Sequence, residues 1–269
     1  MNLPEFLIDK LKFQYGQELT EEIINGYSKK RVTTFRVNTL KSNKEEIENV
    51  LNSLNIEYEN VSWSEDAFIL KNVNELDIEK MDIYKDGKIY LQSLSSMIPP
   101  IVLMPKEGKD ILDMAAAPGG KTTQMAALSN NKAHITACEM NNIRIEKLKY
   151  NLEKQGASCV YVMQKDSRQI DDFFSFDQIL LDSPCSGSGT LESNNVNTEK
   201  YFTPKLVEKS TKAQYALLKK ALRILKPGHE MVYSTCSILK EENEEIVKKV
   251  LKEAKAEIVK IEFDGIVVK

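Results

Sequence analysis

The 269-residue chain has little of what marks several common classes of protein. Its four cysteines include no C-x-x-C pair, and its only histidines are His134 and His229, so neither a zinc site nor a disulfide framework is indicated. No apolar run approaches the roughly 18 residues of a membrane span, and the N-terminus lacks the basic and apolar regions of a signal peptide. We therefore expect a cytoplasmic protein with reduced thiols, no metal centre and no membrane association.

The chain also lacks a strong excess of charge of either sign. Its formal charge of -3 at pH 7 excludes a uniformly basic nucleic-acid-binding protein, so any such partner must meet a local patch. Residues 28–44 hold six Lys and Arg side chains and no acid, and residues 200–226 hold eight with one glutamate. Each cluster fits either a solvated face or a phosphate-binding surface.

Strands and helices alternate through the second part of the chain. Apolar spacing predicts strands at 110–114, 134–139, 159–165, 176–182, 230–236 and 256–262, and helices at 118–129, 141–156, 203–226 and 240–254, with a short one near 168–174. This alternation builds a parallel sheet with helical crossovers, whose ligands bind outside the carboxyl ends of the strands.

A smaller α/β unit is predicted in front of this sheet. Its expected helices are 3–14, 18–28 and 44–54, and its expected strands are 33–38, 56–61 and 67–70. A proline pair within residues 90–100 is expected to end or kink a helix in the connection to the main domain. The predicted domains are therefore residues 1–89, a small N-terminal α/β domain with its linker, and residues 90–269.

Residues 110–123, DILDMAAAPGGKTT, have the pattern of a strand, a compact loop and the start of a helix. We call residues 115–121 the glycine loop, because its glycines allow a ligand to approach the backbone at the helix N-terminus. A phosphate-binding P-loop would need a glycine at Ala115, and Pro118 has no N–H to offer a phosphate. A nucleoside ligand without a pyrophosphate, such as S-adenosylmethionine, fits better; a nucleotide-binding P-loop-like protein is the alternative.

Acidic residues end four successive predicted strands. They are Asp113, Glu139, Asp166 and Asp182. An acid closing a single strand is ordinary turn chemistry, but four at one edge of a sheet favour a shared site. Glu139 follows Gly120 by 19 positions, where a carboxylate holds a ribose diol in nucleotide-binding folds, and Asp166 is placed to meet an adenine ring.

Two further strand ends carry sulfur. Cys185 follows the fourth strand in the motif DSPCSG, and Cys236 follows the fifth in YSTCS. The fold rule brings both to one crevice, where a thiolate nucleophile or a redox pair fits the pattern. Cys138 and Cys159 lie within or at the start of strands and are interpreted as small buried hydrophobic residues.

These motifs together resemble RNA cytosine-5 methyltransferases of the Sun/Fmu (NSUN, RsmB/RsmF-like) type. The matching segments follow in the expected order over roughly residues 31–246 and are 36–40, 92–103, 113–122, 182–187, 233–237 and 241–244. Amino-methylating relatives typically carry D/N-P-P-Y at the fourth strand, where this chain has DSPC. The resemblance implies a Rossmann-like class I S-adenosylmethionine-dependent methyltransferase fold.

The resemblance also implies a reaction, the transfer of a methyl group to carbon 5 of a cytidine in rRNA or tRNA. Cys236 would add to carbon 6 as the nucleophile, while Cys185 would help to remove the carbon 5 proton and release the product. Asp182 would bind the ring nitrogen, and Lys121 would hold cofactor or substrate groups. The implied S-adenosylmethionine ligands are Ala115, Ala116, Ala117, Pro118, Gly119, Gly120, Lys121, Glu139, Arg144, Asp166 and Asp182. A non-catalytic RNA-binding module with the same fold is a further alternative.

The implied partner is RNA with its target base unpaired or flipped out, and we expect the protein to act as a monomer. Residues 186–197 are typical of a substrate-gated loop or of a plain connection. The chain departs from common family members at Ala115, where Cys is frequent, and at Ser183, where Ala is frequent. We expect the sequence given to lack the family's final strand or its C-terminal RNA-binding extension.

Overall fold

The computed structural model describes residues 3–191 and 198–261, which fall into two compact units. Unit 1 comprises Met1–Arg31, Leu181–Arg223 and Tyr233–Glu257; unit 2 comprises Val32–Leu180, Ile224–Val232 and Ile258–Lys269. The N-terminal segment thus groups with segments from the second half of the chain. This division differs from the expected boundary after residue 89, which stays a prediction.

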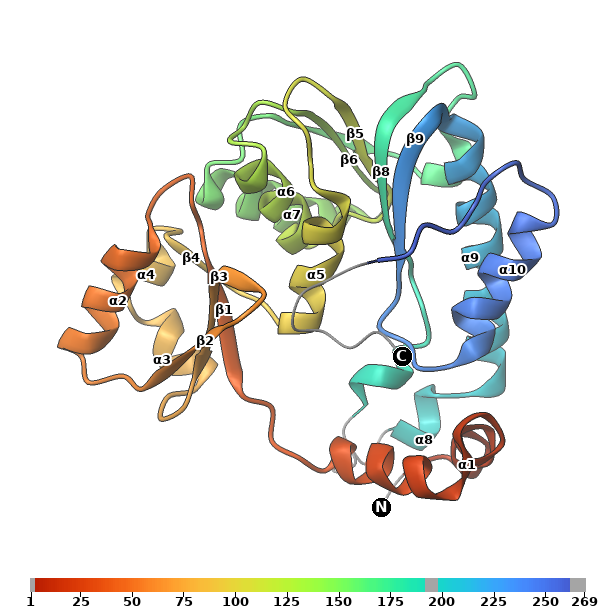
Figure 1. Cartoon of the computed structure of the whole chain (residues 1–269), viewed down its shortest axis with the longest axis horizontal. Helices are drawn as coiled ribbons and strands as arrows, with labels where there is room; N and C mark the ends of the chain where they lie inside the picture. The colour runs from red at the N-terminus through yellow and green to blue at the C-terminus, as the bar shows by residue number, and fades with distance from the viewer. Residues whose placement is uncertain (1–2, 192–197, 262–269) are drawn as a thin grey trace. The chain divides into compact units, whose positions relative to one another are not determined.

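A five-stranded sheet with the order β7-β6-β5-β8-β9 confirms the predicted α/β architecture (Figure 1). Its strands are β5 (Asp110–Asp113), β6 (His134–Glu139), β7 (Val160–Gln164), β8 (Phe176–Asp182) and β9 (Leu225–Ser234). The β5–β6, β6–β7 and β5–β8 pairs are parallel, as helical crossovers require.

Helices α5 (Leu94–Leu103), α6 (Gly120–Leu128) and α7 (Asn142–Gln155) pack against this sheet. Their buried contacts with the strands include Leu103, Ile111, Met125, Ile135, Leu148 and Leu180. This packing fixes the ends of β5 and β6, and therefore the glycine loop and Glu139, relative to each other.

Helix α5 continues through Pro99 and Pro100 to Leu103, so of the two predicted effects, an end or a kink, the proline pair does not end the helix. A proline cannot donate the backbone hydrogen bond of a helix, and the Gln92 side chain supplies the donor that the Ser96 carbonyl lacks because of Pro100. Gln92 Nε2 donates to the Ser96 carbonyl at 3.0 Å, and Gln124 Nε2 donates to the Met97 carbonyl at 2.9 Å.

Unit 2 also contains a small antiparallel sheet with the order β2-β3-β1-β4. Its elements are β1 (Thr33–Val37), α2 (Lys44–Ser53), β2 (Tyr58–Val61), β3 (Ser64–Leu70), α3 (Glu75–Glu79), α4 (Asp82–Lys85) and β4 (Ile89–Leu91). The stacked rings of Phe35 and Phe68, 5.1 Å apart, lie at its core. The small α/β unit is therefore confirmed, while α3, α4 and β4 were not predicted.

Unit 1 is built from α1 (Glu5–Tyr27), α8 (Thr198–Tyr201), α9 (Pro204–Ile224) and α10 (Glu244–Leu251). A positive φ of 77° at Gly16 breaks α1, which explains why the sequence predicted two helices there. Its buried face packs on the segments around β8 and β9 through Leu3, Leu7, Leu11, Leu191, Phe202, Val207 and Leu239. No described helix is long and apolar enough to cross a membrane.

Three predicted elements are wrong in part. No strand forms over residues 256–261, where the side chains of Ile258 and Val259 are 70% and 73% exposed and so gain no burial; residue 262 lies outside the described residues. The helix expected at 168–174 is only a 3₁₀ turn, Ser167–Gln169, and that at 240–254 starts with another, Lys240–Glu242. The loop predicted at 186–197 is described only in part, because residues 192–197 lie outside the described residues.

Candidate active site

The glycine loop of unit 2 is fastened to the sheet by the residue that precedes it. Asp113 ends β5 with a side chain that is 1% exposed, and its carboxylate accepts hydrogen bonds from Thr122 Oγ1 at 2.7 Å and from the Ala115 N–H at 3.3 Å. The Ala116 N–H donates to the Cys138 carbonyl of β6 at 2.9 Å. These contacts join the strand end, the loop and the first turn of α6 into one rigid turn.

The two glycines of this loop lie close against side chains of the protein itself. A Cβ on Gly119, whose φ is 109°, would lie 3.1 Å from Leu148 Cδ1 of α7. A Cβ on Gly120 would lie 3.2 Å from the ring of Tyr90. The glycines therefore allow close packing on α7 and Tyr90, which the sequence analysis did not foresee when it assigned them to ligand approach alone.

Arg36 supports the loop from β1 and was not predicted to do so. Its side chain, 3% exposed, donates to Gln92 Oε1 at 2.9 Å, to Thr123 Oγ1 at 2.8 Å and to the Gly120 carbonyl at 3.2 Å. Burial lowers the pKa of Arg36 to about 10, although the ring of Tyr90 lies 5.1 Å from the guanidinium carbon. Arg36 is thus buried and unavailable to phosphate, so the basic cluster at 28–44 has one member fewer than predicted.

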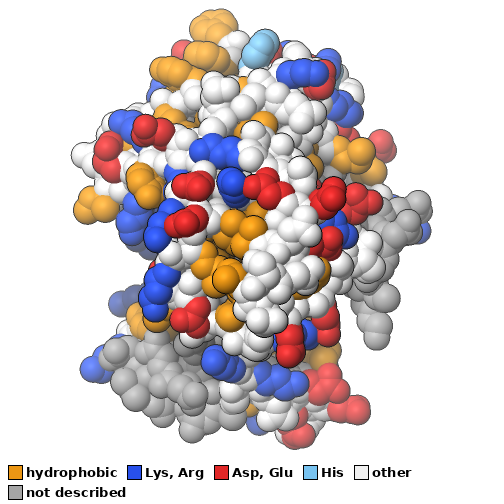
Figure 2. Space-filling view, turned by 90° about the vertical axis from the view of Figure 1, so that its left-hand side faces the viewer, with side chains coloured by type: hydrophobic (Ala, Val, Ile, Leu, Met, Phe, Trp, Pro, Cys, Tyr) orange, Lys and Arg blue, Asp and Glu red, His pale blue; other side chains and the backbone are white. Residues whose placement is uncertain are grey.

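The remaining members of that cluster include Lys29, Lys30 and Arg31, which are exposed. On the face shown in Figure 2, Lys and Arg side chains alternate with Asp and Glu rather than forming a field of one sign. That distribution agrees with the small net charge of -3. A nucleic acid would therefore have to be held by particular side chains rather than by overall attraction.

Three of the predicted cofactor ligands lie together at the end of β6. Glu139 Oε1 accepts from the N–H groups of Met140 and Asn141 at 2.8 and 2.9 Å, and Arg144 Nη1 lies 3.1 Å from Glu139 Oε2. Arg144 Nη2 donates to the Ala117 carbonyl at 2.6 Å. Arg144 thereby connects the acidic strand end to the glycine loop.

Asp166 and Lys121 are each engaged with a neighbouring side chain. Arg168 Nη2 and Nε lie 2.6 and 2.9 Å from the Asp166 oxygens, and this hydrogen bonding lowers the pKa of Asp166. A ligand amino group would have to share that carboxylate with Arg168. Lys121 Nζ donates to Ser96 Oγ of α5 at 2.7 Å.

The two cysteines predicted to meet do so, within unit 1. Cys185 Sγ lies 3.0 Å from Cys236 Sγ, with Cys236 exposed and Cys185 half-buried. The hydrogen bond with Cys236, together with burial, raises the pKa of Cys185 well above its usual range. Asp182, at the end of β8, accepts from Ser234 Oγ of β9 at 2.7 Å.

The segments that carry these cysteines, residues 183–190 and 235–239, are named here the cysteine segments. The Gly189 N–H donates to the Cys236 carbonyl at 2.9 Å, and a Cβ at Gly189 would lie only 2.8 Å from that oxygen. From α1, Tyr15 donates to the Ile238 carbonyl at 2.5 Å and Tyr27 to the Ser188 carbonyl at 2.7 Å. No local pattern in the sequence predicts these contacts of α1.

The other two cysteines behave as small hydrophobic residues. Cys138 is buried in β6, and burial raises its pKa to about 11. Cys159 packs against the same core, and burial raises its pKa too. A thiol that resists ionisation is a poor nucleophile, and these two lie in or beside the core, whereas Cys236 is exposed.

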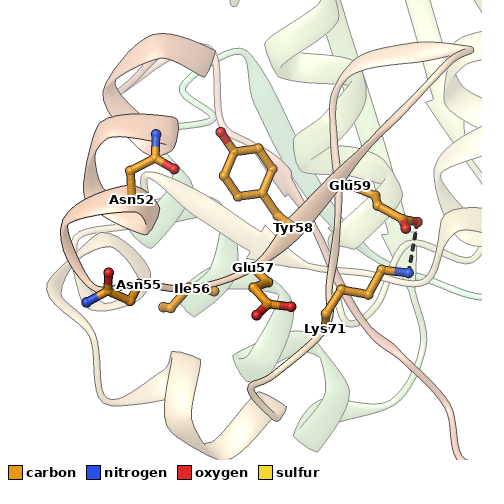
Figure 3. A pocket seen from close by; sticks show the side chains of 7 residues that line it. All are labelled: Asn52, Asn55, Ile56, Glu57, Tyr58, Glu59 and Lys71. Atoms are coloured by element: carbon orange, nitrogen blue, oxygen red, sulfur yellow. Dashed lines mark ion pairs between the residues drawn. The ribbon is translucent and has the colours of Figure 1, made fainter.

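The small sheet of unit 2 carries a hollow (Figure 3). Side chains of the α2 end and of β2 line it, and Figure 3 shows the ion pair in which Lys71 Nζ lies 2.8 Å from Glu59 Oε2. Its lining residues are Asn52, Asn55, Ile56, Glu57, Tyr58, Glu59 and Lys71. We assign it no role.

The parallel sheet and the acids at its strand ends define a class I methyltransferase fold, and comparison with known proteins identifies the family. A model described as 16S rRNA methyltransferase RsmB/F matches residues 100–268, and one for the ferredoxin-like domain of RsmF/B-like methyltransferases matches residues 3–77. This chain belongs to the RsmB/F methyltransferase family.

Individual relatives agree with that assignment. Ribosomal RNA small subunit methyltransferase F of Shewanella loihica is 35% identical over 233 residues, which are 84% of this chain and 48% of the relative. The chain thus spans about half the length of the curated relatives it matches. Among solved structures, a methyltransferase homolog protein from Pyrococcus horikoshii is 34% identical with a TM-score of 0.79, over 93% of this chain and 83% of that one.

A more distant solved structure shares the fold alone. NSun6 from Pyrococcus horikoshii, solved with SFG, is 23% identical with a TM-score of 0.84, over 94% of this chain and 88% of that one. The similarity confirms the fold predicted from the sequence.

Proposed function

We propose that this chain transfers a methyl group from S-adenosylmethionine to carbon 5 of a cytidine in RNA, through a covalent bond between Cys236 and the base. The observation that carries the proposal is the 3.0 Å approach of Cys185 Sγ to Cys236 Sγ in a chain of the RsmB/F family. The family description and the names of the curated relatives favour rRNA of the small ribosomal subunit as the substrate, with tRNA as the alternative.

The residues of unit 2 fit S-adenosylmethionine better than a nucleoside triphosphate. In the glycine loop the Ala116 and Gly119 N–H groups already donate to protein carbonyls, at 2.9 and 2.8 Å, and Pro118 has no N–H. Thr122, which would serve a magnesium ion in a P-loop, donates to Asp113 instead. A phosphate cradle therefore lacks its donors, whereas carboxylates at strand ends suit ribose hydroxyls and an amino group.

In this proposal Glu139 and Asp166 hold the nucleoside, and the glycine loop, Arg144 and Lys121 complete the pocket. Bound S-adenosylmethionine supplies an electrophilic methyl group. Asp182 protonates or hydrogen-bonds the ring nitrogen of the cytosine, where negative charge develops when a nucleophile adds to carbon 6. The second cysteine is needed because carbon 5 must lose its proton after methylation.

The two thiols divide this work through their hydrogen bond. The raised pKa of Cys185 keeps it protonated, so that its thiol donates to the Cys236 thiolate and favours that ion. When the Cys236 electron pair forms the bond to carbon 6, this hydrogen bond loses its acceptor charge. The pKa of Cys185 then falls toward its usual value, so its thiol can release its proton to solvent. The resulting thiolate accepts the carbon 5 proton, and elimination of Cys236 as a thiolate restores the carbon 5–carbon 6 double bond and completes the turnover.

Nucleoside analysis of small-subunit rRNA after incubation with the protein and S-adenosylmethionine tests the proposal. We expect 5-methylcytidine with the wild type and with the control Cys159→Ser, and none with Cys236→Ser. We expect Cys185→Ser to accumulate a protein–RNA adduct that survives denaturation, because it can attack but not release. Full activity of Cys236→Ser would refute the covalent route.

Calorimetric titration with S-adenosylmethionine and, separately, with ATP and magnesium needs no knowledge of the RNA. Saturable binding of the methyl donor alone supports the proposal. Binding of ATP alone would support a nucleotide-binding protein, and binding of the methyl donor without any 5-methylcytidine would support an RNA-binding module that retains the fold.

A further inference from the structure

Glu242 is a buried acid that the proposed reaction does not use. Its side chain is 0% exposed and lies in the 3₁₀ turn Lys240–Glu242, in the same unit as both cysteines. A buried carboxyl group is costly unless every oxygen is hydrogen-bonded, so its partners indicate what it does.

The partners of Glu242 are the neighbours of the two cysteines. Oε1 accepts from the Ser186 N–H at 2.8 Å, and Oε2 accepts from Ser186 Oγ at 2.5 Å; Ser186 directly follows Cys185. Oε2 also accepts from Ser237 Oγ at 2.5 Å, and Ser237 directly follows Cys236. One carboxyl group therefore binds both cysteine segments.

A third element joins this group from α9. Gln214, fully buried, donates from Nε2 to Glu242 Oε1 at 3.2 Å and to the Pro184 carbonyl at 3.1 Å. The Tyr233 hydroxyl donates to the backbone carbonyl of Glu242 at 2.7 Å, which fixes the turn itself to β9. The residues before and after Cys185 are thus both held, and the sulfur has little freedom to move away from Cys236.

We infer that Glu242 is a positioning residue that holds the sulfurs of Cys185 and Cys236 in contact, and that the division of labour between the two thiols depends on it. The inference rests on the proposed function. Glu242 touches neither sulfur and acts through Ser186 and Ser237. The segments also contact each other directly through Gly189 and Ser188, but those contacts lie three or more residues beyond Cys185. Removing the Glu242 carboxyl group takes away the contact next to both cysteines, so Cys185 would be held less closely against Cys236, to donate to its thiolate or to accept the carbon 5 proton.

The contact between the sulfurs can be tested without RNA, by measuring the rate at which diamide oxidises the two thiols to a disulfide. The two thiols lose two hydrogens, which the azo bond of diamide accepts, and the rate reports how often the sulfurs meet. We expect Glu242→Ala to slow this reaction at least tenfold. Glu242→Gln keeps an oxygen that can accept from the two N–H donors, and its amide NH2 group can donate to the two serine hydroxyl oxygens. We therefore expect its rate of disulfide formation to stay within threefold of the wild type.

Glu241→Gln is the matched control, because Glu241 is adjacent and pairs with Lys10 at 2.6 Å instead. We expect no change in its rate. In steady-state assays on rRNA we expect Glu242→Ala to lower kcat at least tenfold with a KM for S-adenosylmethionine within twofold of the wild type, and Glu242→Gln to recover most of kcat. A thermal melt identifies variants that fail to fold.

If Glu242→Ala does not fold, Ser186→Ala removes one hydroxyl donor and leaves the backbone contact in place, and we expect a disulfide rate three- to tenfold below the wild type. A folded Glu242→Ala, or failing that Ser186→Ala, with a wild-type disulfide rate would overturn the inference. Slow disulfide formation in Glu242→Ala together with an absence of 5-methylcytidine from the wild type would refute the proposed function and leave the positioning role standing. A wild-type kcat in Glu242→Ala, with 5-methylcytidine formed, would refute the positioning role and leave the proposed function standing.

Discussion

The glycine loop and the cysteine segments both follow strands of the large sheet, yet they are held over very different distances along the chain. Most partners of the glycine loop lie within about thirty positions: Asp113 binds Thr122 and Ala115, and Ala116 binds Cys138. The cysteine segments are held by Glu242, 56 positions from Ser186, and by Tyr15, 223 positions from Ile238. A cofactor pocket can thus be encoded locally, whereas the reacting groups depend on the assembled fold.

The largest expected effect separates the two regions. Asp113→Ala leaves Thr122 and the Ala115 N–H without their acceptor, so we expect affinity for S-adenosylmethionine to fall roughly 100-fold by calorimetry. The rate of disulfide formation between Cys185 and Cys236 should not change. The control is Asp110→Ala, which removes a half-buried acid from the opposite end of the same strand, where its partners are Lys226 and His134. A fall in both quantities would show that the regions are not independent.

Gly189→Ala tests the cysteine segments by steric means. Its Cβ would lie 2.8 Å from the Cys236 carbonyl, so the backbone that carries the nucleophile must shift. We expect methyl transfer to slow roughly tenfold or more, since small misplacements at a reacting group are costly, while cofactor affinity is retained. The matched control, Gly26→Ala, meets nothing within 4 Å in α1 and should gain up to about 1 kcal/mol in free energy of unfolding. Equal kinetics for the two variants would contradict the crowding argument.

The pH dependence of alkylation by iodoacetamide tests how the two thiols influence each other. The pKa of Cys185 is raised, first by its hydrogen bond with Cys236 and then by burial. Cys236→Ala removes the first cause, so the pKa of Cys185 should fall and more of it should be thiolate at pH 8. We expect iodoacetamide to alkylate Cys185 about tenfold faster in that variant, with the pH midpoint moved down by about one unit. An unchanged midpoint would mean that burial alone sets the pKa.

The smallest effects are expected from surface ion pairs, one in each unit. Lys10 pairs with Glu241 at 2.6 Å, and Lys106 pairs with Glu230 at 2.9 Å. Because all four side chains are partly exposed, we expect Lys10→Ala and Lys106→Ala each to cost no more than about 1 kcal/mol in urea unfolding. A much larger loss for Lys10→Ala would show that this ion pair, rather than apolar packing, attaches α1 to its unit.

The difference between the regions also explains what the sequence could predict. Both ends of β6 and of β8 were predicted to the residue, and the turn from Asp113 into α6 was recognised. The spacing of apolar residues and the positions of glycines are signals that lie within the segment itself. The meeting of Cys185 and Cys236 followed from a general rule about parallel sheets. These successes required no knowledge of contacts between distant side chains.

The failures share one cause. Arg36 was counted with exposed basic residues, although it is buried under Tyr90 and bound to the Gly120 carbonyl. Glu242 was noted only as part of the matching segment 241–244 and was given no role, and its four donors come from three separate segments. The strand predicted at 256–262 has the right composition but exposed apolar side chains over its described residues. Burial of a charge or exposure of a β-branched residue is decided by tertiary packing, which a single sequence does not record.

The composition of unit 1 from three distant segments has a consequence for the order in which the protein is made. Helix α1 is synthesised first, but its partner at Glu241 is 231 positions further along the chain. During translation the apolar face of α1 cannot be fully buried until nearly the whole described sequence has left the ribosome. The small sheet of unit 2, in contrast, can form from segments that are close in sequence. Contacts between residues so far apart in sequence form slowly during folding. The cysteines should therefore acquire their reactive geometry last, after the cofactor pocket has formed.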